Sequence, residues 1–182
     1  MTSKTKSEFE KQVKRIVSQT LKRVRYFEIQ YEDNQSYWNQ DDRFDSLDYG
    51  LDLEMMNGEV FGITWGAEFL PYGVSVDFKS LSNVLGRVQT WDVSDNSRWA
   101  DLIGHKILDA RVYWSWVTTD GKRTEYPQNI ELVFDKNHKV YLSAFEIRPD
   151  GSQLGMMDHI TVFFSEDDVR EFKIGLYEVK KK

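Results

Sequence analysis

Alternating hydrophobic and polar positions predict a β-hairpin in the first half of the chain. Residues 51–54 read Leu-Asp-Leu-Glu, a period of two that is typical of a strand with one buried face. The dipeptide Asn57-Gly58 follows and predicts a two-residue type I′ turn, because Asn and Gly both tolerate positive φ angles. The chain returns through residues 60–65, where β-branched and aromatic residues favour a second strand.

Apolar residues spaced three and four apart predict an N-terminal amphipathic helix over residues 7–17. Ser7 is expected to cap its first turn, and Glu10 to complete a capping box. Ser97 is expected to cap a short helix, and Ser165 another. Further alternating segments predict strands over residues 27–31, 74–78, 107–117, 130–134, 140–144 and 160–164.

These elements predict an α+β fold dominated by antiparallel β-sheet, in a single domain over residues 1–182. The order helix, strand, loop, strand, turn, strand, bend, strand occurs twice, as an internal repeat of about 80 residues. Residues 7–78 and 95–172 are therefore predicted to be two related halves, and chance recurrence of a common hairpin arrangement is the alternative. The repeat also predicts that the first helix ends near residue 17.

The composition fits one packed core and excludes several classes of protein. The 182 residues are 40% hydrophobic and 14% aromatic, which is too apolar for a disordered chain. The absence of cysteine removes disulfides, thiolate metal sites and thiol nucleophiles. No apolar run approaches the ~20 residues of a membrane span. The first residues also lack the apolar segment of a signal peptide, so we expect a cytoplasmic protein without membrane association.

The formal net charge of −6 is unevenly distributed. Basic residues gather within residues 1–25, whereas residues 32–54 carry eight acidic side chains opposed by Arg43 alone. An acidic body repels nucleic acid, whose binding depends on basic side chains that displace counterions. It attracts a basic protein. We therefore predict a basic protein partner and no nucleic acid, and an ordinary solvated acidic surface is the alternative.

No motif in the sequence identifies a reaction. His105, His138 and His159 lack the spacing of a local metal site, and the aspartates between residues 41 and 52 do not follow the calcium-loop pattern. Asp158 and His159 are adjacent, and adjacent strand residues point to opposite faces, which argues against a general base there. The sequence therefore predicts no catalytic residue, no cofactor and no metal.

The aromatic residues indicate binding instead. Six Trp, nine Tyr and eleven Phe exceed the usual content of a core of this size, although filling the space between sheet and helices is the alternative. The leading hypothesis is a non-enzymatic, immunity-like interaction protein that presents an acidic, aromatic-containing surface to its basic partner. The expected contact residues are Tyr37, Trp38, Asp41, Asp42, Asp45 and Asp48, with Tyr37 and Trp38 exposed. The alternative is a small-molecule or glycan binder, or a weak hydrolase, with a concave sheet face lined by Trp65, Trp114 and Trp116.

Overall fold

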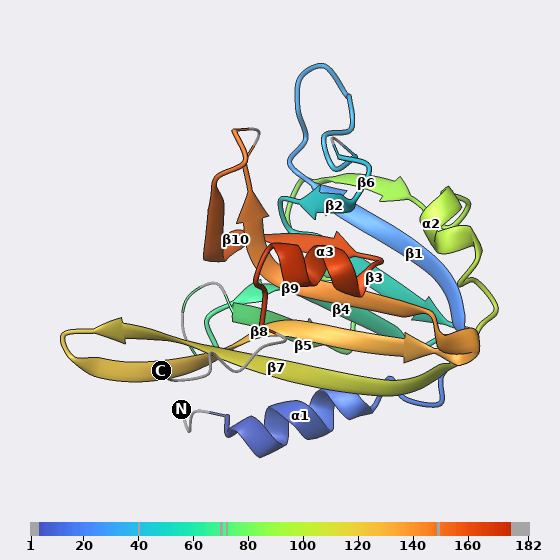
Figure 1. Cartoon of the computed structure of the whole chain (residues 1–182). Coiled ribbons are helices and arrows are strands. Elements are labelled where there is room, and N and C mark those ends of the chain that lie inside the picture. Colours follow the sequence, from blue (N-terminus) through green and yellow to red (C-terminus); the bar gives the residue numbers. More distant parts are fainter. Residues whose placement is uncertain (1–3, 40, 70, 72, 149, 176–182) are drawn as a thin grey trace.

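Two five-stranded antiparallel sheets face each other in the computed structural model, which describes residues 4–39, 41–69, 71, 73–148 and 150–175 (Figure 1). The first sheet contains β1 (Leu21–Glu28), β3 (Gly50–Met55), β4 (Val60–Gly66), β5 (Gly73–Asp77) and β6 (Gln89–Asp92). The second contains β2 (Phe44–Leu47), β7 (Ile107–Thr119), β8 (Lys122–Phe134), β9 (Lys139–Ile147) and β10 (Gln153–Phe163). The helices are α1 (Lys6–Lys14), α2 (Ser97–Ala100) and α3 (Glu166–Glu171), with 3₁₀ turns η1 (Leu81–Asn83) and η2 (Asp135–Asn137). The predicted β-rich α+β class with antiparallel sheets is confirmed.

Each sheet is built on four antiparallel strands that follow one another across it. The strand orders are β5-β4-β3-β1-β6 and β2-β10-β9-β8-β7, so β6 is added beside β1 and β2 beside β10. The sequence pattern predicts neither added strand, because four residues offer too little alternation to identify a strand. The same arrangement of four strands occurs in both sheets, while the predicted duplication of related halves stays a prediction.

The two sheets are joined at one end by a reciprocal pairing of residues 18–21 with residues 104–107. The backbone N–H of Ser18 donates to the carbonyl of Ile107 at 2.8 Å, and that of Gly104 donates to the carbonyl of Leu21 at 2.8 Å. Both donors have left-handed backbone angles, with φ of 72° at Ser18 and 82° at Gly104. The two segments therefore turn alike, immediately before β1 and β7 begin.

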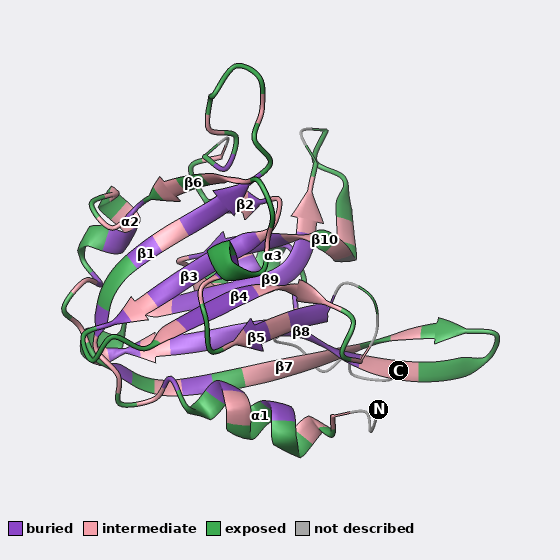
Figure 2. Ribbon diagram, turned by 180° about the vertical axis from the view of Figure 1, so that it is seen from behind, coloured by how far each residue is buried: buried purple, intermediate pink, exposed green. Residues whose placement is uncertain are grey.

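The main core lies between the inner faces of the sheets, where β3, β8 and β9 are buried along most of their length (Figure 2). Leu51 and Leu53 of the first sheet belong to the same apolar cluster as Ile130 and Leu132 of the second. Strands β4 and β5 pack against β8, β9 and β10. Removing these apolar surfaces from water is the main free-energy gain that holds the sheets together.

The predicted hairpin over residues 51–65 is present as β3 and β4, but its predicted turn is wrong. Only Gly58 has a positive φ, of 88°, because the side chain of Asn57 accepts a hydrogen bond from the backbone N–H of Glu59 at 3.0 Å. The backbone N–H of Met55 donates to the carbonyl of Glu59 at 2.8 Å, so the loop inside this bond has three residues, 56–58, and ends in the left-handed Gly58. The two-residue turn with two positive φ angles joins β7 and β8 instead, at Asp120 and Gly121 (51° and 74°).

Of the predicted helix caps, Ser165 is confirmed, while the caps of α1 and α2 lie at Thr5 and Asn96, two residues and one residue before the predicted Ser7 and Ser97. Thr5 caps α1, accepting a hydrogen bond from the backbone N–H of Glu8, whose carboxylate accepts one from the backbone N–H of Thr5. Ser7 lies inside the helix, because the earlier Thr–Glu pair has the same capping-box spacing. The helix ends at Lys14, a few residues before the predicted end. None of the described helices is long and apolar enough to cross a membrane.

The replacement Gly50→Ala should lower the free energy of unfolding by about 3 kcal/mol or more, because backbone strain and a steric clash combine. Gly50 has a φ of 142°, and a Cβ there would lie 2.0 Å from the carbonyl oxygen of Ile63. Gly58→Ala is the matched control: its φ is 88° with no atom within 4 Å of the added carbon. It should lose only about 1 kcal/mol. Urea unfolding measures both, and equal losses would contradict the steric argument.

Candidate functional site

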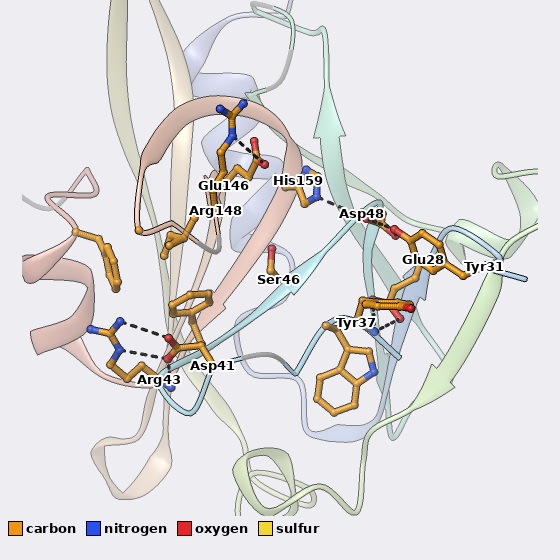
Figure 3. Close-up of a pocket in the computed structure, with 15 residues that line it drawn as sticks. Glu28, Tyr31, Tyr37, Asp41, Arg43, Ser46, Asp48, Glu146, Arg148 and His159 are labelled. Carbon is orange, nitrogen blue, oxygen red and sulfur yellow. Dashed lines mark hydrogen bonds and ion pairs between the residues drawn. The ribbon is translucent and has the colours of Figure 1, made fainter. Parts of the chain in front are cut away.

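A pocket of about 540 Å³ lies where the end of β1, β2, β9, β10 and the segment after α3 meet the loop that follows β1 (Figure 3). That loop is described for residues 29–39 and 41–43. The lining residues are Glu28, Tyr31, Tyr37, Trp38, Asp41, Arg43, Phe44, Ser46, Asp48, Glu146, Ile147, Arg148, Gly151, His159 and Phe172. The lining therefore mixes aromatic rings with more acidic than basic side chains.

Glu28, the last residue of β1, is the most buried acid of this pocket, with 1% of its surface exposed. Its carboxylate accepts hydrogen bonds from the indole N–H of Trp91 at 2.7 Å and from the backbone N–H of Tyr37 at 3.2 Å. Burial raises the pKa of Glu28 to about 7, helped by the nearby charge of Asp48 and opposed by the bond from Trp91. Glu28 is therefore partly protonated near neutral pH.

Asp48, in the turn between β2 and β3, connects several sides of the pocket. Its Oδ2 accepts hydrogen bonds from the backbone N–H of Ile29 at 2.8 Å and from the hydroxyl of Tyr31 at 3.1 Å. Its Oδ1 lies 3.5 Å from Nε2 of His159, and Figure 3 shows the two side chains facing each other. Burial, together with the charge of Asp48, raises the pKa of Tyr31 to about 12, so its hydroxyl keeps the proton that it donates.

His159 lies in a bulge of β10, where the pairing with β9 shifts between Gly155 and Ile160. The argument from strict alternation fails here, because Nδ1 of His159 lies 3.7 Å from the carboxylate of the adjacent Asp158. This nitrogen is buried and has no hydrogen-bond partner among the described residues. Since Nε2 faces Asp48, neither ring nitrogen is open to a substrate. The geometry favours a structural role for His159 over proton transfer.

The predicted aromatic pair Tyr37 and Trp38 separates into one exposed and one buried residue. Tyr37 is 37% exposed and its ring lies edge-on to Tyr31, with centroids 4.7 Å apart. The prediction of an exposed Trp38 is wrong, because its ring packs edge-on against Tyr26 at 5.2 Å and is only 9% exposed. The indole N–H of Trp38 has no hydrogen-bond acceptor in the described part of the chain.

The predicted acidic contact residues also occupy different environments. Asp41 and Asp48 line the pocket, and Asp42 is exposed outside it. Asp45 is 1% exposed and accepts hydrogen bonds from the hydroxyl of Tyr26 and from Arg98, both at 2.7 Å. Burial raises the pKa of Asp45 to about 6, opposed by the hydrogen bond from Tyr26 and the charge of Arg98. Asp45 is therefore not available to a partner, and its inclusion among the surface contacts is corrected.

The three tryptophans of the alternative hypothesis do not line this pocket. The indole N–H of Trp65 donates to the carbonyl of Asp48 at 2.8 Å. Trp114 contacts Phe9 of α1 edge-on at 5.9 Å, so the helix covers it. Trp116, in the extended β7–β8 hairpin, is 42% exposed and stacks with the guanidinium of Arg123 at 4.0 Å. The three rings therefore do not form a shared concave face, because each one contacts a different neighbouring element.

No group of three or more His, Asp or Glu side chains is arranged to hold a metal ion within the described ranges. Comparison of the chain with known protein families, with characterised proteins and with solved structures gave no match. The function is therefore argued from the pocket itself.

The variant Glu28→Gln should reveal the raised pKa as a pH-dependent difference in stability. The pKa of Glu28 is about 7 in the folded protein and 4.5 in its ordinary state. Protonation of Glu28 therefore favours the folded state. Its contribution to stability is complete below pH 4.5 and is lost as the pH rises through 7. The wild type should therefore lose stability relative to Glu28→Gln between about pH 5 and about pH 8. Urea unfolding at both pH values measures this. The exposed Glu32→Gln is the control, and a pH-independent difference for Glu28→Gln would contradict the assignment.

Proposed function

We propose that this protein is a non-catalytic binding protein whose pocket holds a small organic ligand. The observation that carries the proposal is two buried polar groups in its lining, one without an ionic partner and one without a hydrogen-bond partner. Glu28 is buried without an ion pair to any described residue, and the indole N–H of Trp38 is buried without an acceptor. Buried groups of this kind are costly, and a ligand that pairs with them recovers the cost.

The size and composition of the pocket support the same function. Its volume of about 540 Å³ lies in the usual range for small-molecule sites. The rings of Tyr31, Tyr37 and Trp38 offer apolar contact, and a few polar groups offer orientation. The ionisable His159 is engaged by Asp48 and offers no open nitrogen, which is the reason to propose binding without catalysis.

A basic protein partner is the second candidate, and exposed acids near the pocket favour it. Asp42 and Glu32 are exposed, and neither forms an ion pair with another described residue. A basic surface approaching this side of the molecule would gain from both charges. A cytoplasmic location remains part of this proposal.

Filling the pocket should abolish ligand binding while leaving the fold intact. Ser46 lies on β2 with its side chain in the pocket lining (Figure 3), so Ser46→Phe would occupy ligand space. In a thermal-shift screen of small molecules, a ligand at 100 times its Kd should raise the Tm of the wild type by about 5 °C or more. The shift should vanish in Ser46→Phe and persist in the control Thr118→Phe on the exposed hairpin. A shift retained in Ser46→Phe would place the ligand elsewhere.

The double variant Asp41→Asn/Asp42→Asn tests the basic-partner candidate. It should slow association with a basic partner several-fold and weaken the salt dependence of the rate, because these charges steer the encounter. The buried Asp45 is left unchanged. Stopped-flow kinetics at two ionic strengths measure the rate, with the exposed Asp101→Asn in the second half as control. Unaltered kinetics in the double variant would rule out steering by this surface.

A further inference from the structure

We infer that the ligand of this pocket is an organic cation, whose positive charge is met by the carboxylate of Glu28 and by the faces of Tyr31 and Tyr37. This inference rests on the proposed ligand-binding function and names the class of the ligand. Three observations support it: the missing counter-charge of Glu28, the engaged state of the basic lining residues, and the aromatic rings beside the acid.

Glu28 differs from the other buried acids of the molecule in having no basic partner. Glu28, Asp45, Asp52 and Glu131 are each exposed by 1% or less. The other three have ion pairs: Asp45 with Arg98 at 2.7 Å, Asp52 with Arg25 at 3.1 Å and Glu131 with Lys139 at 3.0 Å. Buried charges in proteins are usually paired in this way. Since Glu28 alone among these acids lines the pocket, its counter-charge is expected from the ligand.

The basic side chains of the pocket are already neutralised by carboxylates. Arg43 contacts Asp41 at 3.2 Å and Glu171 at 3.1 Å, and Arg148 lies 3.5 Å from Glu146. Figure 3 shows Arg43 turned toward Asp41 and Arg148 turned toward Glu146. An anionic ligand would have to compete with them, whereas a cation meets an excess of negative charge.

The aromatic rings favour a cation over a neutral ligand. A cation within about 6 Å of a ring face gains roughly 0.5–2 kcal/mol from the ring quadrupole, more as water is excluded. Tyr31 and Tyr37 form an edge-to-face pair at 4.7 Å, and both line the pocket with Glu28. A carboxylate in the same pocket as aromatic rings suits a protonated amine or a quaternary ammonium group.

Binding of a cation should release a proton from Glu28 near neutral pH. The titratable groups that face it are Asp48, whose charge raises its pKa, and Tyr31, with His159 beyond Asp48. A positive charge at the carboxylate favours its ionised form. Affinity for a cation should therefore increase by about tenfold from pH 6 to pH 8, as Glu28 loses its proton.

The test compares three probes of similar shape and different charge. 2-Phenylethylamine is a cation in this pH range, 2-phenylethanol is neutral and phenylacetate is an anion. Titrations followed by NMR and calorimetry should show the amine binding about tenfold or more tightly than the alcohol, and phenylacetate more weakly still. In Glu28→Gln the preference for the amine should fall several-fold, to the part that the aromatic rings and Asp48 supply, whereas the exposed control Glu32→Gln should retain the full preference.

Proton release provides a second readout that needs no variant. Calorimetry of the wild type at pH 7 in two buffers of different ionisation enthalpy should show protons released with the amine and none with the alcohol. Equal binding of alcohol and amine, tighter binding of phenylacetate, or no proton release would overturn the cation inference and leave the pocket as a ligand site. The cation inference would also be overturned if none of the three probes bound and a wider screen found only neutral or anionic ligands. A screen without any ligand would instead refute the proposed function.

Discussion

The reciprocal pairing of residues 18–21 with residues 104–107 is the constraint on which the architecture depends. It fixes the starting points of β1 and β7 beside each other and so joins the two sheets at one end. From there β1 runs for eight residues, roughly 26 Å, to Glu28. The pocket therefore lies at the opposite end of the two sheets from the pairing of residues 18–21 with residues 104–107. There, loops and short strands meet the ends of β1 and β9.

The buried acidic side chains show how the pocket end of the molecule differs in charge pairing from the body of the sheets. Along the body of the sheets, buried acids lie beside an arginine or lysine from another strand, as with Asp52 of β3 and Arg25 of β1. At the pocket end, Glu28 is stabilised only by neutral N–H donors. Hydrogen bonds satisfy its oxygen atoms but supply no net charge, so its protonation remains sensitive to whatever enters the pocket.

Local patterns predict much of the fold and little of the site. The strands of the β3–β4 and β8–β9 hairpins follow from alternation and turn residues within short windows. The site depends on contacts between distant segments: Trp91 reaches Glu28 across 63 residues, and His159 reaches Asp48 only through a bulge. The alternating pattern predicts that Glu28 lies on a polar, exposed face. This is wrong because β6 and the loop after β1 cover Glu28, and a local pattern contains no information on such distant contacts. The acidic segment and the exposure of Tyr37 are predictable from the sequence, whereas the burial of Trp38 and Asp45 and the partners of these residues are not.

Strand β2 has a consequence for the mechanics of the molecule. It lies early in the chain, between strands of the first sheet, yet it pairs with β10 at the edge of the second. Its residues Phe44 and Ser46 also form one wall of the pocket. A ligand in that pocket would therefore contact both sheets and hold β2 in place. Hydrogen exchange of the β2 amides would measure the free energy of local opening of this strand.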